Sequence, residues 1–136
     1  MSWLLPDTGF MILIIFAMRG LNKVTLIGNL GAEPDFQQLE AGSSGGNVAV
    51  AKLSLATTEA YKDRNGQTQY NTDWHTVILW RNLAELAHKY LRKGSFVYIE
   101  GKLKTRHYDD KEGNRRYVTE VVAEQLIMLD KKVGDD

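Results

Sequence analysis

Apolar and polar residues alternate with a period of two along much of this chain, and a helical period replaces that alternation in one segment. Residues 48–57 show the alternation clearly, because one face of an extended strand there would carry Ala49, Ala51, Leu53 and Leu55. Successive strand side chains point to opposite faces, so this pattern is typical of a strand with one buried face. The chain is therefore expected to build its core mainly from strands.

Four further segments have the composition of strands and are bounded by turn residues: 22–30, 71–80, 95–108 and 115–129. Asn65 and Gly66 are a strong turn signal, so residues 48–57 and 71–80 are expected to form a hairpin with a long tip at 61–71. Residues 36–40 are expected to extend only briefly before a Gly/Ser-rich loop at 41–47.

Residues 82–94 follow a helical period, with apolar residues three or four positions apart. Asn82 and Glu85 have the spacing of a capping box, and Gly94 stands where a C-terminal cap is expected. The segment is therefore predicted to be one short amphipathic helix.

Five strands with one helix between the third and fourth can close into a small barrel. Gly28 and Gly101 interrupt the first and fourth strands, where glycine marks a bulge or a bend. The predicted fold class is all-β, a five-stranded Greek-key barrel of the OB-fold type with one short α-helix.

The charges of the chain balance overall but not locally. The 136 residues carry 17 Lys/Arg and 17 Asp/Glu, yet residues 88–117 hold nine basic and four acidic side chains. Such a segment attracts anionic ligands locally, although solvated strand and loop lysines would give the same count. The chain contains no cysteine, which fits a reducing cytoplasm and excludes disulfides.

No arrangement of residues suggests catalysis. His75, His88 and His107 lack the spacing of metal ligands, and the acidic residues at 109–112 fall in a turn that needs polar side chains. We therefore expect a non-enzyme without a metal ion or a cofactor.

Aromatic residues interleaved with basic ones are the strongest functional signal. In residues 71–80, Trp74 and Trp80 share one strand face, whereas His75 and Val77 point to the other. Stacking on a ring contributes roughly 1–3 kcal/mol per base of single-stranded nucleic acid. The alternatives are that the rings belong to the core or to an oligomer interface, or that a bulge near Ile78 breaks the alternation.

Five blocks carry a family resemblance in order across residues 18–130: NKVTLIGNLG, LSLATTEAY, TDWHTVILW, LAELAHKYLRKGSFVYIEGKLKTRHY and GNRRYVTEVVAEQLIML. Together they resemble the bacterial single-stranded DNA-binding protein family. The resemblance implies an OB-fold that assembles as a homotetramer. It also implies a cytoplasmic, nucleoid-associated protein that wraps single-stranded DNA and protects it in replication, recombination and repair.

The resemblance also implies roles for individual residues. The stacking positions of the family fall on Tyr61, Trp74, Trp80 and Tyr108, and the two tyrosines stand where many members have tryptophan. His75, with Val77 on the same strand face, falls at a subunit contact. The implied phosphate-facing cations are Lys23, Lys62, Lys93, Lys104 and Arg106.

Both ends are expected to lie outside the barrel. The nine apolar residues at 10–18 are too few for a membrane span of about 20. Residues 1–17 are predicted to be an apolar extension, with an export signal as the alternative. Residues 18–130 are the expected domain, and 131–136 a short tail. The chain ends in DKKVGDD rather than in the family's acidic Pro-Phe tip, so recruitment of replication and repair proteins through such a tip is not expected.

Two other functions stay open from the sequence. One is an RNA-preferring OB-fold protein of the cold-shock type, which competition between DNA and RNA oligomers would detect. The other is an assembly or accessory protein like the primosomal replication-restart subunits, for which a dimer rather than a tetramer is expected.

Overall fold

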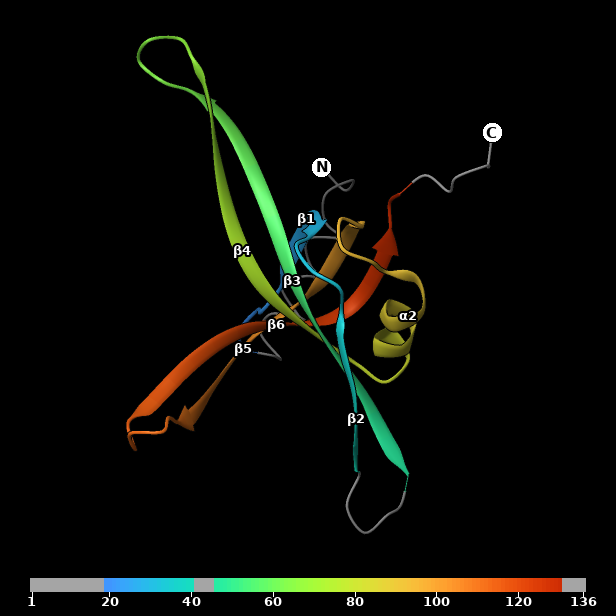
Figure 1. Ribbon diagram of the computed structural model, residues 1–136. Helices are drawn as coiled ribbons and strands as arrows, with labels where there is room; N and C mark the ends of the chain where they lie inside the picture. The colour runs from blue at the N-terminus through green and yellow to red at the C-terminus, as the bar shows by residue number, and fades with distance from the viewer. Residues whose placement is uncertain (1–18, 41–45, 131–136) are drawn as a thin grey trace, which may run out of the picture.

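The computed structural model describes residues 19–40 and 46–130, so the predicted extension and tail lie outside the described residues. Those residues form six strands and one helix (Figure 1). In chain order the elements are β1 (Val24–Leu30), β2 (Asp35–Glu40), β3 (Asn47–Lys62), β4 (Thr68–Trp80), α2 (Asn82–Tyr90), β5 (Phe96–Asp109) and β6 (Arg115–Met128).

Five of the strands close into a barrel. The hydrogen-bonded order is β1-β5-β6-β4-β3-β2, and an additional pairing of β1 with β3 completes the circuit. All neighbours are antiparallel except β4 and β6, which pair in parallel at Val77/Val121 and Ile78/Val122. The predicted OB-fold class is confirmed. β2 is an additional strand that pairs with β3 outside the circuit, so α2 lies between the third and fourth strands of the barrel.

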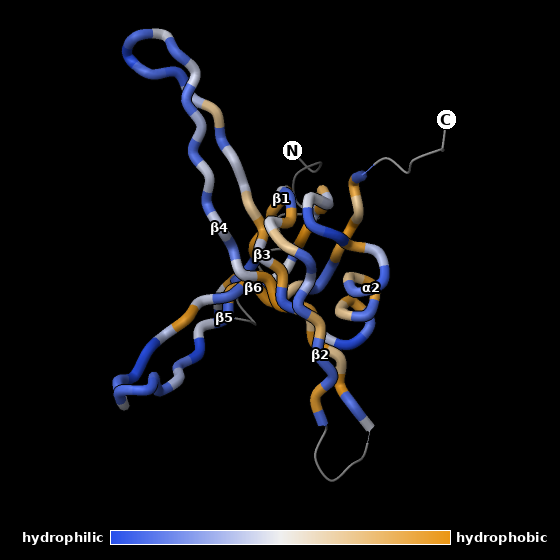
Figure 2. The backbone as a smooth tube through the Cα atoms, in the orientation of Figure 1, coloured by the Kyte–Doolittle hydropathy of each residue, from blue (hydrophilic) through white to orange (hydrophobic). Residues whose placement is uncertain are grey.

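The apolar residues of the alternating pattern face the interior of the barrel, and the residues between them face outward. Leu53 and Leu55 of β3 are buried together with Val77 and Leu79 of β4, and Ile99 of β5 joins them. Hydrophobic stretches gather in the barrel, whereas the parts of the hairpins that extend beyond it are largely hydrophilic (Figure 2). Burial of these aliphatic side chains supplies the main stabilisation, since each contributes roughly 1.5–3 kcal/mol.

The two strand glycines have different roles. At Gly101 the register of β5 against β6 shifts, which confirms the predicted irregularity. β1 instead keeps a regular register through Gly28, so no bulge forms there. A Cβ added at Gly28 would collide with the carbonyl oxygen of Ala56 on β3. Gly28 therefore permits the close approach of β1 to β3 that closes the barrel.

The β3–β4 and β5–β6 hairpins continue past the barrel as two diverging arms (Figure 1). The tip of the first arm is only 63–67, so the expectation of a long loop at 61–71 is wrong. Asp63 ties this tip together, since its Oδ1 accepts the N–H groups of Gln67 and Asn65. These bonds lower the pKa of the Asp63 carboxyl.

The second arm ends in the same kind of turn. Asp110 Oδ1 accepts the N–H groups of Glu112 and Asn114, and Arg116 donates to its Oδ2 at 2.9 Å. The Arg116 bond is the main cause that lowers the pKa of Asp110. Of the acidic residues expected in this turn, Asp110 holds it together by its carboxylate, whereas Asp109 still belongs to β5.

The helix is shorter than predicted and lacks the predicted caps. Residue 81, not Asn82, is the N-cap, and no side chain caps the helix. The N–H of Arg81 continues the ladder by donating to Ala49 at 2.8 Å, and its φ of 57° turns the chain directly into α2. At the other end Leu91 is extended, and Gly94 lies in the turn that follows. Strand pairing thus sets the start of the helix.

Candidate nucleic-acid interface

β4 presents its two tryptophans on the outer face of the barrel. The register between β3 and β4 has no shift along its whole length, so the alternative of a bulge near Ile78 is wrong. Trp74 is 61% exposed and Trp80 43%, whereas Leu79 between them is fully buried. Neither tryptophan belongs to the core of the chain.

A cavity of about 600 Å³ opens beside Trp80 on this outer face. Its walls come from four strands, because β4 lies beside β6 and β6 pairs with β5. Apolar side chains from β3, β4 and β6 meet three cations from β5 there. The lining residues are Val50, Ile78, Trp80, Lys102, Lys104, Arg106, Glu120 and Val122.

Arg106, one of the three cations, is held by a carboxylate. Its Nε donates to Glu120 Oε1 at 2.9 Å, and its Nη2 donates to Oε2 at 3.3 Å. The Glu120 side chain is only 7% exposed, whereas Arg106 stays half-exposed. These bonds raise the pKa of the Arg106 guanidinium, and the Glu120 carboxylate neutralises its charge locally. Lys102 and Lys104 have no ion pair within the described residues.

The ion pair leads to a testable prediction. Glu120→Gln keeps the shape of the side chain but removes its charge, so Arg106 becomes free to contact a phosphate. The slope of log K against log salt for a single-stranded oligomer is expected to steepen by about 0.7, the value for one added phosphate contact. A salt titration of oligomer binding measures this slope. Arg106→Gln in the otherwise unchanged chain is the control. If that variant flattens the slope by about 0.7, Arg106 already binds phosphate and the prediction fails.

The Trp74 ring lies against a glycine. A Cβ added at Gly31, just after β1, would stand 2.7 Å from Trp74 Cη2, which is closer than carbon atoms approach. The absence of a side chain at this position therefore leaves space for the indole. The end of β1 thus positions a ring that belongs to β4.

The remaining aromatic positions divide between two faces. Tyr108 shares its β5 face with Lys104 and Arg106, so it lies on the outer face that bears the cavity. Tyr61 pairs with Gln69, and both point to the face opposite Trp74. The structure therefore brings three of the four predicted rings to one face, and Tyr61 lies on the other face of the β3–β4 arm.

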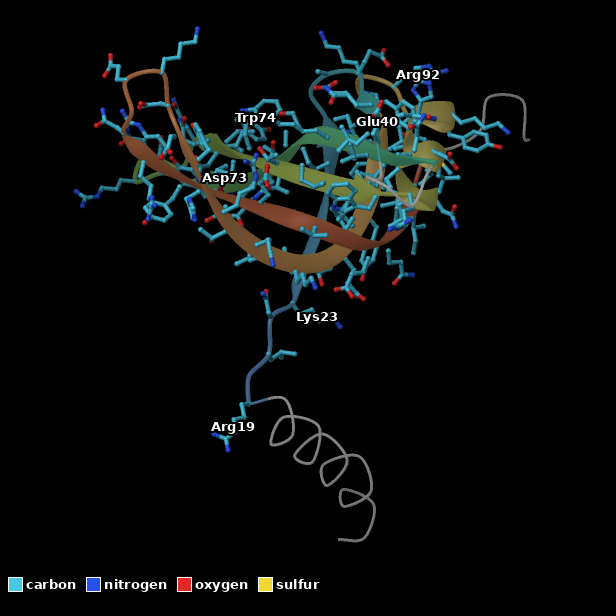
Figure 3. The ribbon with its side chains drawn as sticks, turned by 90° about the horizontal axis from the view of Figure 1, so that it is seen from below. Arg19, Lys23, Glu40, Asp73, Trp74 and Arg92 are labelled. Carbon is cyan, nitrogen blue, oxygen red and sulfur yellow. The ribbon has the colours of Figure 1, made fainter. Side chains whose placement is uncertain are left out.

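The other predicted phosphate-facing cations lie on different parts of the molecule. Lys62 pairs with Thr68 on the Trp74 face of the arm. Lys93 lies in the turn after α2, which is tied to the end of β1 because Gly94 donates to the Leu30 carbonyl at 2.8 Å. Lys23 approaches Glu100 at 3.6 Å and lies on the side of the barrel away from Trp74 (Figure 3).

The two residues expected at a subunit contact differ in burial. His75 is half-buried, and its Nε2 lies 2.8 Å from the Thr57 hydroxyl. Val77 is fully buried inside its own chain. Because a side chain without exposed surface cannot touch a second subunit, the assignment of Val77 to an interface is corrected to a core role.

Three residues of the site were not among those expected: Gly31, Lys102 and Glu120. Lys102 could have been predicted from the sequence, since it shares a strand face with Lys104 and Arg106 at a spacing of two residues. The other two act through contacts between strands distant in sequence, which no local pattern shows. Within residues 19–40 and 46–130, no three acidic or histidine side chains group as metal ligands would.

Comparison with known proteins identifies the family. A sequence model of the single-strand binding protein family matches residues 21–129. The chain belongs to this family. Single-stranded DNA-binding protein 1 of Xylella fastidiosa (strain 9a5c) is 44% identical over 116 residues, which cover 85% of this chain and 82% of that protein. The protein of the same name from Chlorobaculum tepidum is 45% identical over 115 residues, covering 84% and 68%.

A solved structure supports the same family membership. It is described as a complex of the Plasmodium falciparum SSB with ssDNA. It matches with a TM-score of 0.68 and 39% sequence identity, and the match covers 82% of this chain and 97% of the other. None of the helices in the described part of the present structure has the length and apolarity needed to cross a membrane.

Proposed function

We propose that this member of the family binds single-stranded DNA without reading its sequence and protects it in replication, recombination and repair. The observation that carries the proposal is the outer face of the barrel, where Trp80 borders a hollow lined by lysines and Trp74 lies exposed on the same face of β4. Bases stack on the rings, and the lysines follow the phosphates. The role is binding, and no catalytic step is part of it.

The chemistry of this face favours sequence independence. Trp74, Trp80 and Tyr108 offer flat rings, and every base has a π-face that can stack on them. Lys62, Lys102 and Lys104 are flexible point charges that suit phosphates, and phosphate contacts carry no sequence information. Such a face holds any unpaired strand.

The proposed binding site also includes Tyr61, Lys23 and Lys93. Two of them can be reached only if the DNA strand follows a particular path. Tyr61 points away from Trp74, so a strand stacked on both rings has to pass around the β3–β4 arm. Lys23 requires the strand to reach the far side of the barrel. Wrapping of a long strand around the protein meets both conditions.

Titration with a thymidine oligomer at two salt concentrations tests the function. Tryptophan emission is expected to fall on binding, because Trp74 and Trp80 stack with bases. If Lys62, Lys102 and Lys104 each contact one phosphate, affinity is expected to drop roughly 20-fold between about 50 and about 200 mM salt. A competing RNA oligomer of equal length is expected to bind more weakly. Unchanged emission and salt-independent binding would contradict the proposal.

We further propose that four copies of the chain assemble through a second outer face, on β1, β5 and β6. There Ile27, Tyr98 and Ile127 are directly paired neighbours in three adjacent strands. Both isoleucines are exposed, and Phe96 and Leu129 add further exposed apolar surface. A contiguous apolar patch of this kind favours association with another protein surface, here a second copy.

The native mass, measured in the same samples as the titration, checks the assembly. A mass of four chains is expected, and half-buried His75 is proposed to contribute to a subunit contact. A stable dimer would instead favour the accessory-protein alternative.

A further inference from the structure

Tyr70 has the largest exposed fraction of any aromatic side chain in the described residues, at 72%. It lies on β4 near the tip of the β3–β4 arm, four residues before Trp74. A large apolar ring left this open at the end of an arm contributes little to the barrel core.

Alternation along β4 places Tyr70 on the same face as Trp74 and Trp80. The register gives both arm rings a small cross-strand partner, since Tyr70 is paired with Ala60 and Trp74 with Ala56. The small partner cannot cover the ring in either pair, so the flat side stays open to a ligand.

The charges of the arm separate by face. The face of Tyr70 carries Lys62 and Lys52 and no acidic residue on β3 or β4. The opposite face, which carries Tyr61, also carries Glu59 and Asp73. An anionic strand is therefore attracted more strongly to the Tyr70 side of the arm than to the Tyr61 side.

The three rings form a widely spaced row along β4. Antiparallel strands rise about 3.4 Å per residue, so Trp74 lies roughly 20 Å from Trp80 and Tyr70 roughly 14 Å beyond it. The row leads from the cavity beside Trp80 along the arm toward its tip.

We propose that Tyr70 is an additional stacking site, which extends the single-stranded DNA path from Trp74 along the outer face of the β3–β4 arm. This inference rests on the proposed function and adds a contact that the sequence resemblance does not supply. The ligand is a single-stranded nucleic acid long enough to pass Trp74.

The inference is tested by measuring the affinity of the full chain for thymidine oligomers of increasing length. Tyr70→Thr removes the ring but keeps a residue that favours strands. Its affinity is expected to match that of the unchanged chain for short oligomers and to fall roughly 5- to 150-fold for oligomers that reach the arm. Tyr70→Phe keeps the ring and is expected to bind like the unchanged chain at every length.

Tyr117→Thr is the matched control, because Tyr117 is a strand tyrosine of similar exposure on the core-side face of the other arm. Its affinity is expected to stay unchanged. Equal losses in the two threonine variants, or no loss in Tyr70→Thr at any length, would overturn the inference. If the unchanged chain bound no oligomer, the proposed function itself would fail. Loss in Trp74→Ala without loss in Tyr70→Thr would leave the function standing and remove only the Tyr70 site.

Discussion

Replacement of both Trp74 and Trp80 by alanine is expected to weaken binding of single-stranded DNA by about 2–6 kcal/mol, because each ring stacks with one base for about 1–3 kcal/mol. This corresponds to a loss of roughly 30-fold to 10⁴-fold. Both rings lie on the exposed outer face, so little of the core is lost with them. Fluorescence anisotropy of a labelled thymidine oligomer measures the affinity without relying on protein emission.

Two controls separate stacking from other effects. The double phenylalanine variant keeps two flat rings and is expected to retain most of the affinity. The slope of log K against log salt is expected to stay the same in the alanine variant, since no phosphate contact is removed. Undiminished affinity of the double alanine variant would remove the outer face from the binding site.

The same substitution at three glycines is expected to have three different results. Gly28→Ala should lower the free energy of unfolding by about 1–3 kcal/mol, because the new Cβ meets the backbone oxygen of Ala56 and forces β1 away from β3. Only two residue pairs, Asn29/Ala56 and Leu30/Leu55, join these strands in the described structure. Urea unfolding at a fixed protein concentration measures the change, since assembly makes stability depend on concentration.

Gly31→Ala is expected to leave the unfolding free energy nearly unchanged but to weaken oligomer binding, because the new Cβ displaces the exposed Trp74 ring rather than backbone. The loss should not exceed that of Trp74→Ala. Gly20→Ala is the control, as no atom of the described residues lies within 4 Å of a Cβ at that position. Equal stability of the Gly28 and Gly20 variants would contradict the barrel-closure role of Gly28.

Burial on one side made the barrel strands predictable. Leu53 and Leu55, like Val77 and Leu79, alternate with less buried residues because one face meets the core, so the local pattern records the strand directly. Beyond the barrel both faces of the arms meet solvent, and that signal disappears. The expected long tip at 61–71 was therefore wrong, although β3 and β4 remain paired up to Lys62/Thr68.

Local signals also misplaced the ends of the helix. Asn82 and Glu85 have capping-box spacing, but the hydrogen bond from Arg81 to Ala49 extends the β3–β4 ladder to the helix start. Strand pairing outweighed the weaker preference for a side-chain cap. Gly94 has a positive φ of 91°, as its glycine identity suggests, but it uses this conformation in a later turn.

The sequence by itself determined which residues of β3 and β4 face inward along the barrel, since alternation is a property of the extended backbone. It thereby placed Trp74 and Trp80 on a common face opposite Leu79. The tertiary structure alone decided which side chains meet on that face: Gly31 lies against Trp74, and the Glu120 carboxylate holds Arg106. It also placed Tyr61 and Tyr70 on opposite faces of the β3–β4 arm. The physical reason is that these relations depend on the register and closure of strands distant in sequence, which only the folded barrel brings together.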